Sequence, residues 1–355
     1  MFEEFGFETL TAPQVTVFFA LAVGALFGFL AQRTAFCFRR SLVGDDRRAA
    51  MGVWLVALAT ALVGTQAAVY SGLISFDDHR FMNTDLPWLA IIVGGLLFGA
   101  GMVLTRGCVS RLTVLTGTGN LRALTVLLIF AITAHATLKG ILAPLRTALG
   151  SVTVTLENAA LPGNALIWTG VLAITALLVA IRSGNRLRTL GLAVLLGALV
   201  PLAWVGTGYV LYDDFDPIAM ESLSFTAPAA DTLFWTVAST SISANFGTGL
   251  VGGVLVGSLI AALLFGGFGW QSFTSPRETG RYAAGAVLMG VGGVLAGGCT
   301  VGAGIAGVPT LSIAAVLAIA TIALGALATN KILNVVPQGR SDASWSAGSA
   351  TQPAE

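Results

Sequence analysis

Three cysteines are the residues of this sequence with types and positions most suited to chemistry. Cys37, Cys108 and Cys299 are its only cysteines, and an odd number this small argues against a disulfide framework. A lone buried cysteine is most often a small apolar filler. Its thiol is also a weak, soft hydrogen-bond donor and a polarizable acceptor. Such a group suits a ligand with an exposed sulfur, such as thiosulfate, better than a hard oxyanion.

Metal chemistry at these thiols is disfavoured. The two histidines, His79 and His135, lie far in sequence from every cysteine, and no CxxC pair is present, so the pattern does not predict a zinc site. Thiolates also bind Cu(I), but the six methionines include no MxxM pair. There is no nucleotide-binding P-loop. We therefore expect no metal, no cofactor and no catalytic residue.

Each cysteine ends an apolar stretch that carries glycines, and two of these stretches resemble each other. Residues 99–108 read GAGMVLTRGC and residues 290–299 read GVGGVLAGGC, with six of the ten positions identical. A Gly/Thr-rich break and a further apolar segment follow both runs. Small residues allow close helix packing in lipid. Chance similarity between glycine-rich helices is the alternative, but the coincident cysteines favour an internal repeat.

Groups that could hold an anion lie beside the cysteines. Arg106 and Arg111 flank Cys108, although arginines at a membrane boundary also extend simply toward water. Gly107 and Gly298 would let backbone N–H groups reach a ligand, and the N-termini of short helices attract negative charge. Asn245, in the segment ISANFG, is a candidate polar contact or, equally, a helix cap.

The elements that position these groups are transmembrane helices. The chain has 355 residues, 55% of them hydrophobic and only 10% charged, whereas about a quarter of the residues in a soluble domain are charged. The net charge of +1 gives no indication of a nucleic-acid partner. The apolar blocks have the length that a bilayer requires. We expect nine spans, at about 14–32, 50–72, 88–105, 122–138, 165–181, 190–211, 247–269, 282–298 and 311–329.

Arginine clusters set the expected orientation. They follow the first and fifth spans, precede the eighth and follow the ninth, so nine crossings place all of them on one side. The positive-inside rule makes that side the cytoplasm. The N-terminus is then outside, the C-terminus is cytoplasmic, and the protein is expected in the plasma (inner) membrane. The arginines and lysine concerned are Arg33, Arg39, Arg40, Arg47, Arg48, Arg182, Arg186, Arg188, Arg277, Arg281, Lys331 and Arg340.

Three short Gly-, Ser- or Thr-rich pieces adjoin full spans, at 106–120, 231–246 and 300–310. We interpret them as re-entrant half-helices and loops rather than interfacial loops, because irregular backbone survives at membrane depth only inside protein or beside a wet cavity. The two cysteine runs then cross in opposite directions, which makes the repeat inverted and favours a substrate site near the midplane. We expect one all-α membrane domain, 1–340, with halves at about 14–150 and 165–330. We expect residues 341–355 to form a disordered cytoplasmic tail.

The motifs around the cysteines resemble a known family. RTAFCFRRSL around Cys37, GCVSRLTVLTGTGN around Cys108 and GVLAGGCTVGAGIAG around Cys299 are similar to the YeeE/YedE family of sulfur transporters, over about residues 14–330. The resemblance implies an hourglass-shaped importer of thiosulfate whose cysteines relay the ion by S–H···S hydrogen bonds, with Cys108 central. It also implies a separate small cytoplasmic sulfur-carrier protein as partner. Some members of the family are linked to selenium compounds.

Two other classes of function compete with thiosulfate import. A membrane sulfurtransferase would take the sulfane sulfur onto a cysteine as a persulfide, which requires a thiol activated by a cation such as Arg106. No resolving cysteine or histidine base is evident for that reaction. A passive channel for small anions is the third possibility. The sequence indicates neither the energy source nor the oligomeric state.

Overall fold

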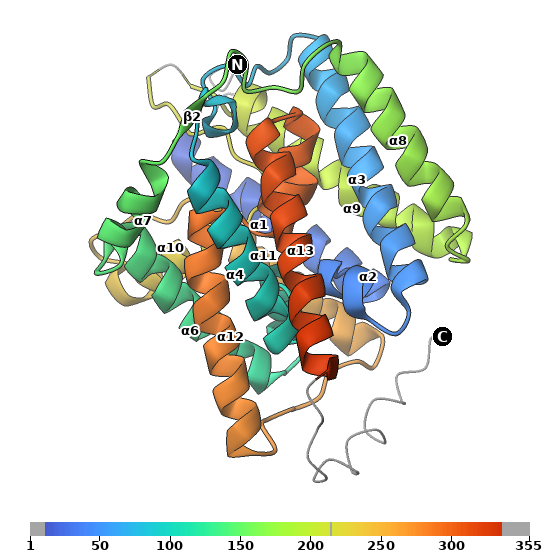
Figure 1. Ribbon diagram of the computed structural model, residues 1–355, viewed down its shortest axis with the longest axis vertical. Helices are drawn as coiled ribbons and strands as arrows, with labels where there is room; N and C mark the ends of the chain where they lie inside the picture. Colours follow the sequence, from blue (N-terminus) through green and yellow to red (C-terminus); the bar gives the residue numbers. More distant parts are fainter. Residues whose placement is uncertain (1–10, 214, 336–355) are drawn as a thin grey trace.

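Helices dominate the computed structural model, which describes residues 11–213 and 215–335. Within these residues, eight helical segments are long and apolar enough to cross a membrane, and Figure 1 shows most of the long helices running along one axis of the molecule. The segments are α1 with α2 (Ala12–Thr34, Phe38–Val43), α3 (Arg47–Tyr70), α4 with α5 (Trp88–Leu104, Val109–Gly117), α6 (Leu121–Lys139), α9 with η3 (Leu187–Val205, Gly206–Val210), α11 (Phe246–Leu264), α12 with η4 and η5 (Pro276–Leu295, Thr300–Gly307, Val308–Thr310) and α13 (Ile313–Val335).

The ninth expected span is a shorter apolar helix, α8 (Ala165–Ile181). Its 17 residues reach only about 25 Å, less than the ~30 Å of a hydrocarbon core. α8 nevertheless connects the loop at 140–164 to the loop at 182–186, so helices are present at all nine expected spans among the described residues, eight of them long enough to cross a membrane and α8 a shorter apolar helix. α8 packs against α3 at the edge of the bundle, and its outward side chains, among them Ile167, Ile174 and Ile181, are exposed apolar groups suited to lipid.

Glycines bring pairs of helices into backbone contact. α1 and α11 run parallel, and a Cβ added to three glycines of α11 would lie only 1.9–2.3 Å from carbonyl oxygens of α1. This is the small-residue packing expected in a membrane, where close approach replaces the hydrophobic effect between helices. The facing pairs are Gly249 with Val17, Gly253 with Leu21 and Gly257 with Ala25.

The two helices that carry the repeated motif, α4 and α12, pack against each other in opposite directions. Gly94 lies against Ala296, while Gly101 lies against Gly285. Their other main partners are exchanged: α4 packs on α13, the helix after the second motif, and α12 packs on α6, the helix after the first. Antiparallel motifs with exchanged partners are the arrangement that an inverted repeat requires.

Short helices form at all three segments expected to be half-helices. The segment 106–120 contains α5, 300–310 contains η4 and η5, and 231–246 continues the helix α10 (Thr226–Ala238). The sequence did not predict α2, which follows Cys37 directly, because its two arginines indicated a loop. It also missed α7 (Ala143–Gly150) and the ribbon formed by β1 (Asp85–Leu86) and β2 (Val154–Thr155).

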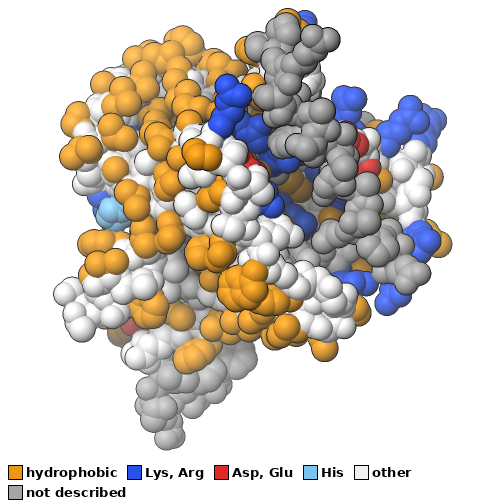
Figure 2. All heavy atoms as spheres, turned by 90° about the horizontal axis from the view of Figure 1, so that it is seen from below, with side chains coloured by type: hydrophobic (Ala, Val, Ile, Leu, Met, Phe, Trp, Pro, Cys, Tyr) orange, Lys and Arg blue, Asp and Glu red, His pale blue; other side chains and the backbone are white. Residues whose placement is uncertain are grey.

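The two ends of the bundle differ in charge. One end, which we call the basic face, consists of the loops at 44–46, 118–120, 182–186 and 265–275, and Figure 2 shows Lys and Arg side chains gathered on it. Hydrogen bonds tie these loops to each other and to the adjoining helices: Gly269 N donates to Thr118 O (3.1 Å), and Asn185 Nδ2 donates to Ala49 O (2.8 Å) in α3. The other end, the ribbon face, consists of the loops at 71–87, 140–164 and 308–312. The terminal tail expected at 341–355 lies outside the described residues.

Candidate functional site

All three cysteines occupy the same local position, the N-cap of a short helix. Cys37 precedes α2, Cys108 precedes α5 and Cys299 precedes η4. In each case the residue two places earlier has a positive φ and ends the preceding long helix. These left-handed residues are Ala35 (φ 49°), Arg106 (φ 59°) and Gly297 (φ 74°).

Left-handed backbone at two of these three places carries a cost. A non-glycine residue in this conformation is disfavoured by about 1–2 kcal/mol, yet Ala35 and Arg106 adopt it. Hydrogen bonds hold the turns: Phe36 N donates to Ala31 O (3.1 Å) and Gly107 N to Met102 O (3.1 Å), the pattern that closes a helix C-terminus. Strained backbone of this kind concentrates at functional sites, and here it directs the chain back into the protein at each cysteine.

Arg40 adds a second tie at the first turn. Its guanidinium donates to Ala35 O (3.2 Å) and pairs with Asp46. The ion pair holds the pKa of the Asp46 carboxyl below its usual value. Arg40 therefore fixes both the left-handed turn before Cys37 and the loop that leads into α3.

The thiols of Cys37 and Cys108 are electrostatic neighbours. Both are buried. The Cys108 Sγ also lies 3.3 Å from Ser110 Oγ, where either atom can donate. The side chain of Thr300 faces Cys108 as well, and its buried hydroxyl has no hydrogen-bond partner among the described residues. Segments more than 190 residues apart in sequence thus meet at Cys108.

Cys299 completes the group from the other copy of the repeat. It is fully buried and accepts a long hydrogen bond from Gly302 N (3.4 Å). Its electrostatic neighbours are Cys108 and Arg80. Arg80 begins the short helix η2 (Arg80–Met82) on the ribbon face. The structure therefore gathers the three cysteines that the sequence singled out.

Of the two arginines beside Cys108 in sequence, Arg111 is the one that faces the thiols. Its charge acts on Cys37 and Cys108. Its guanidinium reaches only long contacts, to Ala31 O (3.5 Å) and Gln32 Oε1 (3.4 Å). A cation with weak partners beside two soft donors is an arrangement suited to an anion.

Arg106 points elsewhere. It is exposed, and its left-handed backbone directs it toward the basic face, away from the Cys108 thiol. The sequence alternative, an arginine that extends toward water, fits this position. Its electrostatic neighbours are Tyr282, Arg281, Arg39 and Glu278.

Asn245 acts as a helix cap. Its Oδ1 accepts from Thr248 N (2.9 Å) and Thr248 Oγ1 (3.0 Å) at the start of α11. The side chain is exposed, and its charged neighbour is Asp231 rather than a cysteine. The structure thus does not bring Asn245 together with the thiols.

The two glycines singled out beside the cysteines differ in the space around them. A Cβ on Gly298 would lie 3.0 Å from Ala303 N, so a side chain there would require the backbone of η4 to shift by a few tenths of an ångström. A Cβ on Gly107 would meet Leu112 at 3.3 Å, a contact that a flexible side chain can relieve. Gly298 is therefore the stricter of the two.

Sequence reasoning missed Ser110, Thr300 and Arg80 as neighbours of the thiols. Ser110 and Thr300 are hydroxyl residues within two positions of a cysteine, a signal available in the sequence. Arg80 is the only arginine or lysine in the loop 71–87. Its approach to Cys299 depends on tertiary structure alone.

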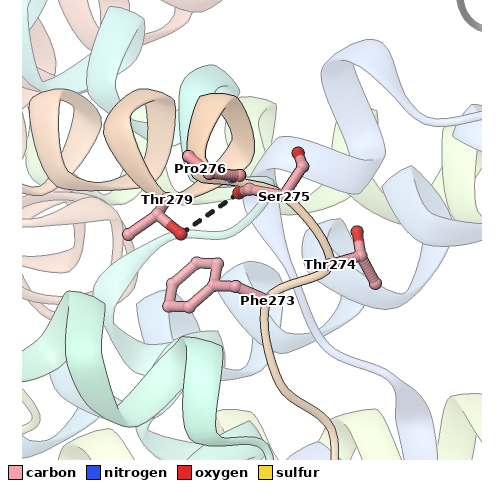
Figure 3. A pocket seen from close by; sticks show the side chains of 5 residues that line it. All are labelled: Phe273, Thr274, Ser275, Pro276 and Thr279. Atoms are coloured by element: carbon pink, nitrogen blue, oxygen red, sulfur yellow. Dashed lines mark hydrogen bonds between the residues drawn. The ribbon is translucent and has the colours of Figure 1, made fainter.

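A pocket on the basic face is separate from the cysteines. Figure 3 shows it at the start of α12, where Thr279 Oγ1 donates to Ser275 O (3.2 Å). The Phe273 ring packs edge-on against Tyr282. The pocket contains no cysteine, so its lining offers no soft donor for the sulfur end of a ligand. Its lining residues are Phe273, Thr274, Ser275, Pro276 and Thr279.

Comparison with known proteins adds a family to this geometry. The profile of a family described as sulphur transport matches residues 33–328. A protein of Escherichia coli K12 named thiosulfate transporter TsuA is 29% identical over 317 residues, covering 80% of this chain and 85% of the relative. A protein of the same name from Spirochaeta thermophila is 25% identical over 339 residues, covering 86% and 95%.

Proposed function

The chain belongs to the sulphur transport family, and from this premise we propose that it imports thiosulfate along a path where Cys37, Cys108 and Cys299 pass the ion between them. The ion's terminal sulfur accepts S–H···S hydrogen bonds from successive thiols. Cys108 is the central station. The names of the two curated relatives support the choice of substrate.

The observation that carries this proposal is the meeting of the three cysteine segments. The Cys37 thiol interacts with Cys108, and Cys108 faces the start of η4 beside Cys299. A thiol relay requires neighbouring thiols, and here they come from different parts of the chain. Three separate cysteines serving as core filler would have no reason to share one local position and one location.

The site also provides positive potential for a dianion. α5 and η4 both begin at a cysteine, so their first N–H groups and the positive ends of their dipoles lie beside the thiols. Arg111 adds a full charge. The thiols select the sulfur end of the ion, while the N–H groups and Arg111 stabilise its oxygens.

The basic face is the cytoplasmic side in this proposal. Its gathered arginines (Figure 2) match the positive-inside rule. The N-terminus is then outside, the C-terminus is inside, and transport through the plasma membrane runs from the ribbon face to the basic face. A small sulfur-carrier protein would receive the product at the basic face.

Proteoliposomes and position-specific labels test this function. Thiosulfate labelled with ³⁵S at either its sulfane or its sulfonate sulfur is supplied to vesicles that contain the purified protein. Intact transport delivers both labels equally, and excess sulfate, which lacks a terminal sulfur, competes poorly. Retention of the sulfane label alone, with release of sulfite, would instead show transfer of that sulfur to a cysteine as a persulfide. Equal competition by sulfate would contradict the role of the thiols.

A further inference from the structure

A buried tryptophan joins two of the short helices that begin at cysteines. Trp54, in α3, is 5% exposed, and the centre of its ring lies 4.7 Å from that of Phe38. Phe38 is the first residue of α2 and directly follows Cys37. The same indole reaches η4, the helix that begins after Cys299, because a Cβ added to Gly304 would lie 3.3 Å from its Cζ2. Trp54 therefore lies between the first turn of α2 and the first turns of η4.

The indole N–H of Trp54 is buried and has no hydrogen-bond partner among the described residues. Nε1 is separated from Cζ2 by a single atom, so the N–H belongs to the edge of the ring that approaches η4. The Phe38 ring is not its acceptor, because the two ring planes are tilted by 43°, far from the edge-on geometry of an N–H···π contact. A buried tryptophan N–H usually has a partner, and an unsatisfied donor costs free energy. This donor is therefore available to a ligand.

A second buried tryptophan, Trp204 in α9, lies in a different environment. Its N–H also has no conventional acceptor in the part of the chain that the structure describes. Its ring, however, meets Phe76 and His79 at centre-to-centre distances of 5.1 Å, with interplanar angles of 85° and 88°. Edge-on packing is the geometry in which a ring face accepts an N–H. Aromatic faces thus surround Trp204, whereas Trp54 has no such neighbour for its N–H.

Thr300 supplies a second unpaired donor on the same side of η4. It is the first residue of this helix and is 1% exposed, and its hydroxyl has no partner among the described residues. Gly304, which meets Trp54, follows four residues later, about one turn of a π-helix. The Thr300 side chain and the Trp54 indole therefore lie on one side of η4, beside the cysteine at which that helix begins.

We propose that Trp54 Nε1 and Thr300 Oγ1 form an oxygen-binding subsite, where both donate to the sulfonate oxygens of thiosulfate while a thiol holds its terminal sulfur. This inference rests on the proposed function and deepens it, because it names groups that recognise the oxygen end of the ion. An indole N–H can only donate, so it favours a ligand rich in acceptors. The subsite and the thiols together select an ion with both ends. Sulfate lacks the terminal sulfur, and hydrosulfide lacks the oxygens.

Equilibrium binding of ³⁵S-labelled thiosulfate to the purified full-length protein tests the subsite, with sulfate and hydrosulfide as competitors. Replacement of the Trp54 indole by benzothiophene, introduced by nonsense-codon suppression, keeps the shape of the ring and removes the N–H. We expect the affinities for thiosulfate and sulfate to fall by the same factor, roughly ten- to a hundredfold, the range for a lost hydrogen bond to a charged group. The affinity for hydrosulfide should be unchanged. Thr300→Val, which removes the hydroxyl, should act in the same direction.

Two further variants serve as controls. The same replacement at Trp204, which is equally buried but packs edge-on against other rings, should leave all three affinities at their native values. Cys108→Ala should show the opposite selectivity to the Trp54 variant, with weaker binding of thiosulfate and unchanged binding of sulfate. The two ends of the ion are then read out by different residues.

The outcomes separate the subsite from the transport function. Native affinities for thiosulfate and sulfate in the Trp54 variant would overturn the inference and leave thiosulfate transport standing. An equal loss of affinity in the Trp204 variant, or an equal loss for hydrosulfide, would also overturn it, because either result would indicate a general change in packing. Absence of thiosulfate binding and uptake by the native protein would overturn the proposed function, and this inference with it.

Discussion

Replacement of the central thiol gives the strongest test of the relay. Cys108 is 1% exposed and interacts with Cys37 and Ser110. Cys108→Ala removes one sulfur atom from a buried site, so we expect a stability loss of about 1 kcal/mol, the lower end for a core truncation. That loss is small enough for the protein to fold and insert normally.

The expected effect on transport is larger than the effect on stability. Each hydrogen bond made to the passing ion contributes about 0.5–1.5 kcal/mol, and 1.4 kcal/mol corresponds to a tenfold change in rate. Loss of the contact made by Cys108 alone therefore lowers uptake about tenfold. In the proposed relay Cys108 passes the ion between two other thiols, so its loss should reduce uptake further, toward background. Cys37→Ala and Cys299→Ala should be impaired less.

The assay is growth on thiosulfate as sole sulfur source, supported by uptake into vesicles. Ser258→Ala is the matched control, because it trims a buried side chain of α11 whose hydroxyl bonds only within its own helix, to Leu255 O (3.1 Å). It should transport like the native protein. If a protein with all three cysteines changed to alanine transported at the native rate, the relay mechanism would be refuted, although the family assignment would stand.

Three further predictions address packing, pH and orientation. Gly253→Ala should lower the free energy of unfolding by about 1–3 kcal/mol, because the added Cβ would lie 2.2 Å from Leu21 O. Gly252→Ala should leave stability unchanged, because nothing lies within 4 Å of its Cβ. Thermal melting in detergent distinguishes the two variants. The pKa of His79 is lowered to about 4, so the unfolded chain binds more protons between that value and about 6.5. The free energy of unfolding should therefore fall from pH 7 to pH 5 in the native protein and fall less in His79→Gln. If melting shows the same fall in both proteins, His79 is not its cause. Cysteines introduced at Arg47 and Asp78 should react with an impermeant reagent from opposite sides, and reaction from the same side would contradict the orientation.

The spans and the position of each cysteine at a helix end were predictable from sequence because both depend on local patterns. Apolar blocks of bilayer length identify helices without knowledge of their partners. Their ends were less certain. α12 begins at Pro276, six residues before the expected start, because Ser275 Oγ accepts from Glu278 N (3.3 Å) and caps a polar first turn. α11 ends at Leu264, five residues early, before a glycine-rich turn.

The neighbours of the thiols were not predictable, because they depend on tertiary contacts. Arg106 and Arg111 lie two and three residues from Cys108 in sequence, yet only the more distant Arg111 acts on the thiols, while Arg106 occupies a left-handed turn. No sequence pattern distinguishes the two. Trp54 and Gly304 come from separate helices and meet only through folding. Hydropathy identifies a span but not which residues line a path through the bundle.

The choice of cysteine as N-cap has a physical consequence for transport. Ser, Thr, Asp and Asn cap helices well because a side-chain oxygen accepts from the first free N–H groups, and Asn120, Asn164, Asn245 and Ser275 do so in this protein. Cys37 and Cys108 make no such bond, and Cys299 makes only a long one.

A weak cap leaves backbone N–H groups available in the interior of the protein, where an unsatisfied donor costs free energy. In the proposed path, a passing anion would satisfy these donors briefly, while the thiol that does not cap the helix would bind the sulfur end. A serine at Cys108 would tend to cap α5 itself and withdraw the donors that the ion needs. Cys108→Ser should therefore transport poorly even though it retains a hydrogen-bonding group, and recovery of native uptake by this variant would show that the N–H groups of α5 have no part in the path.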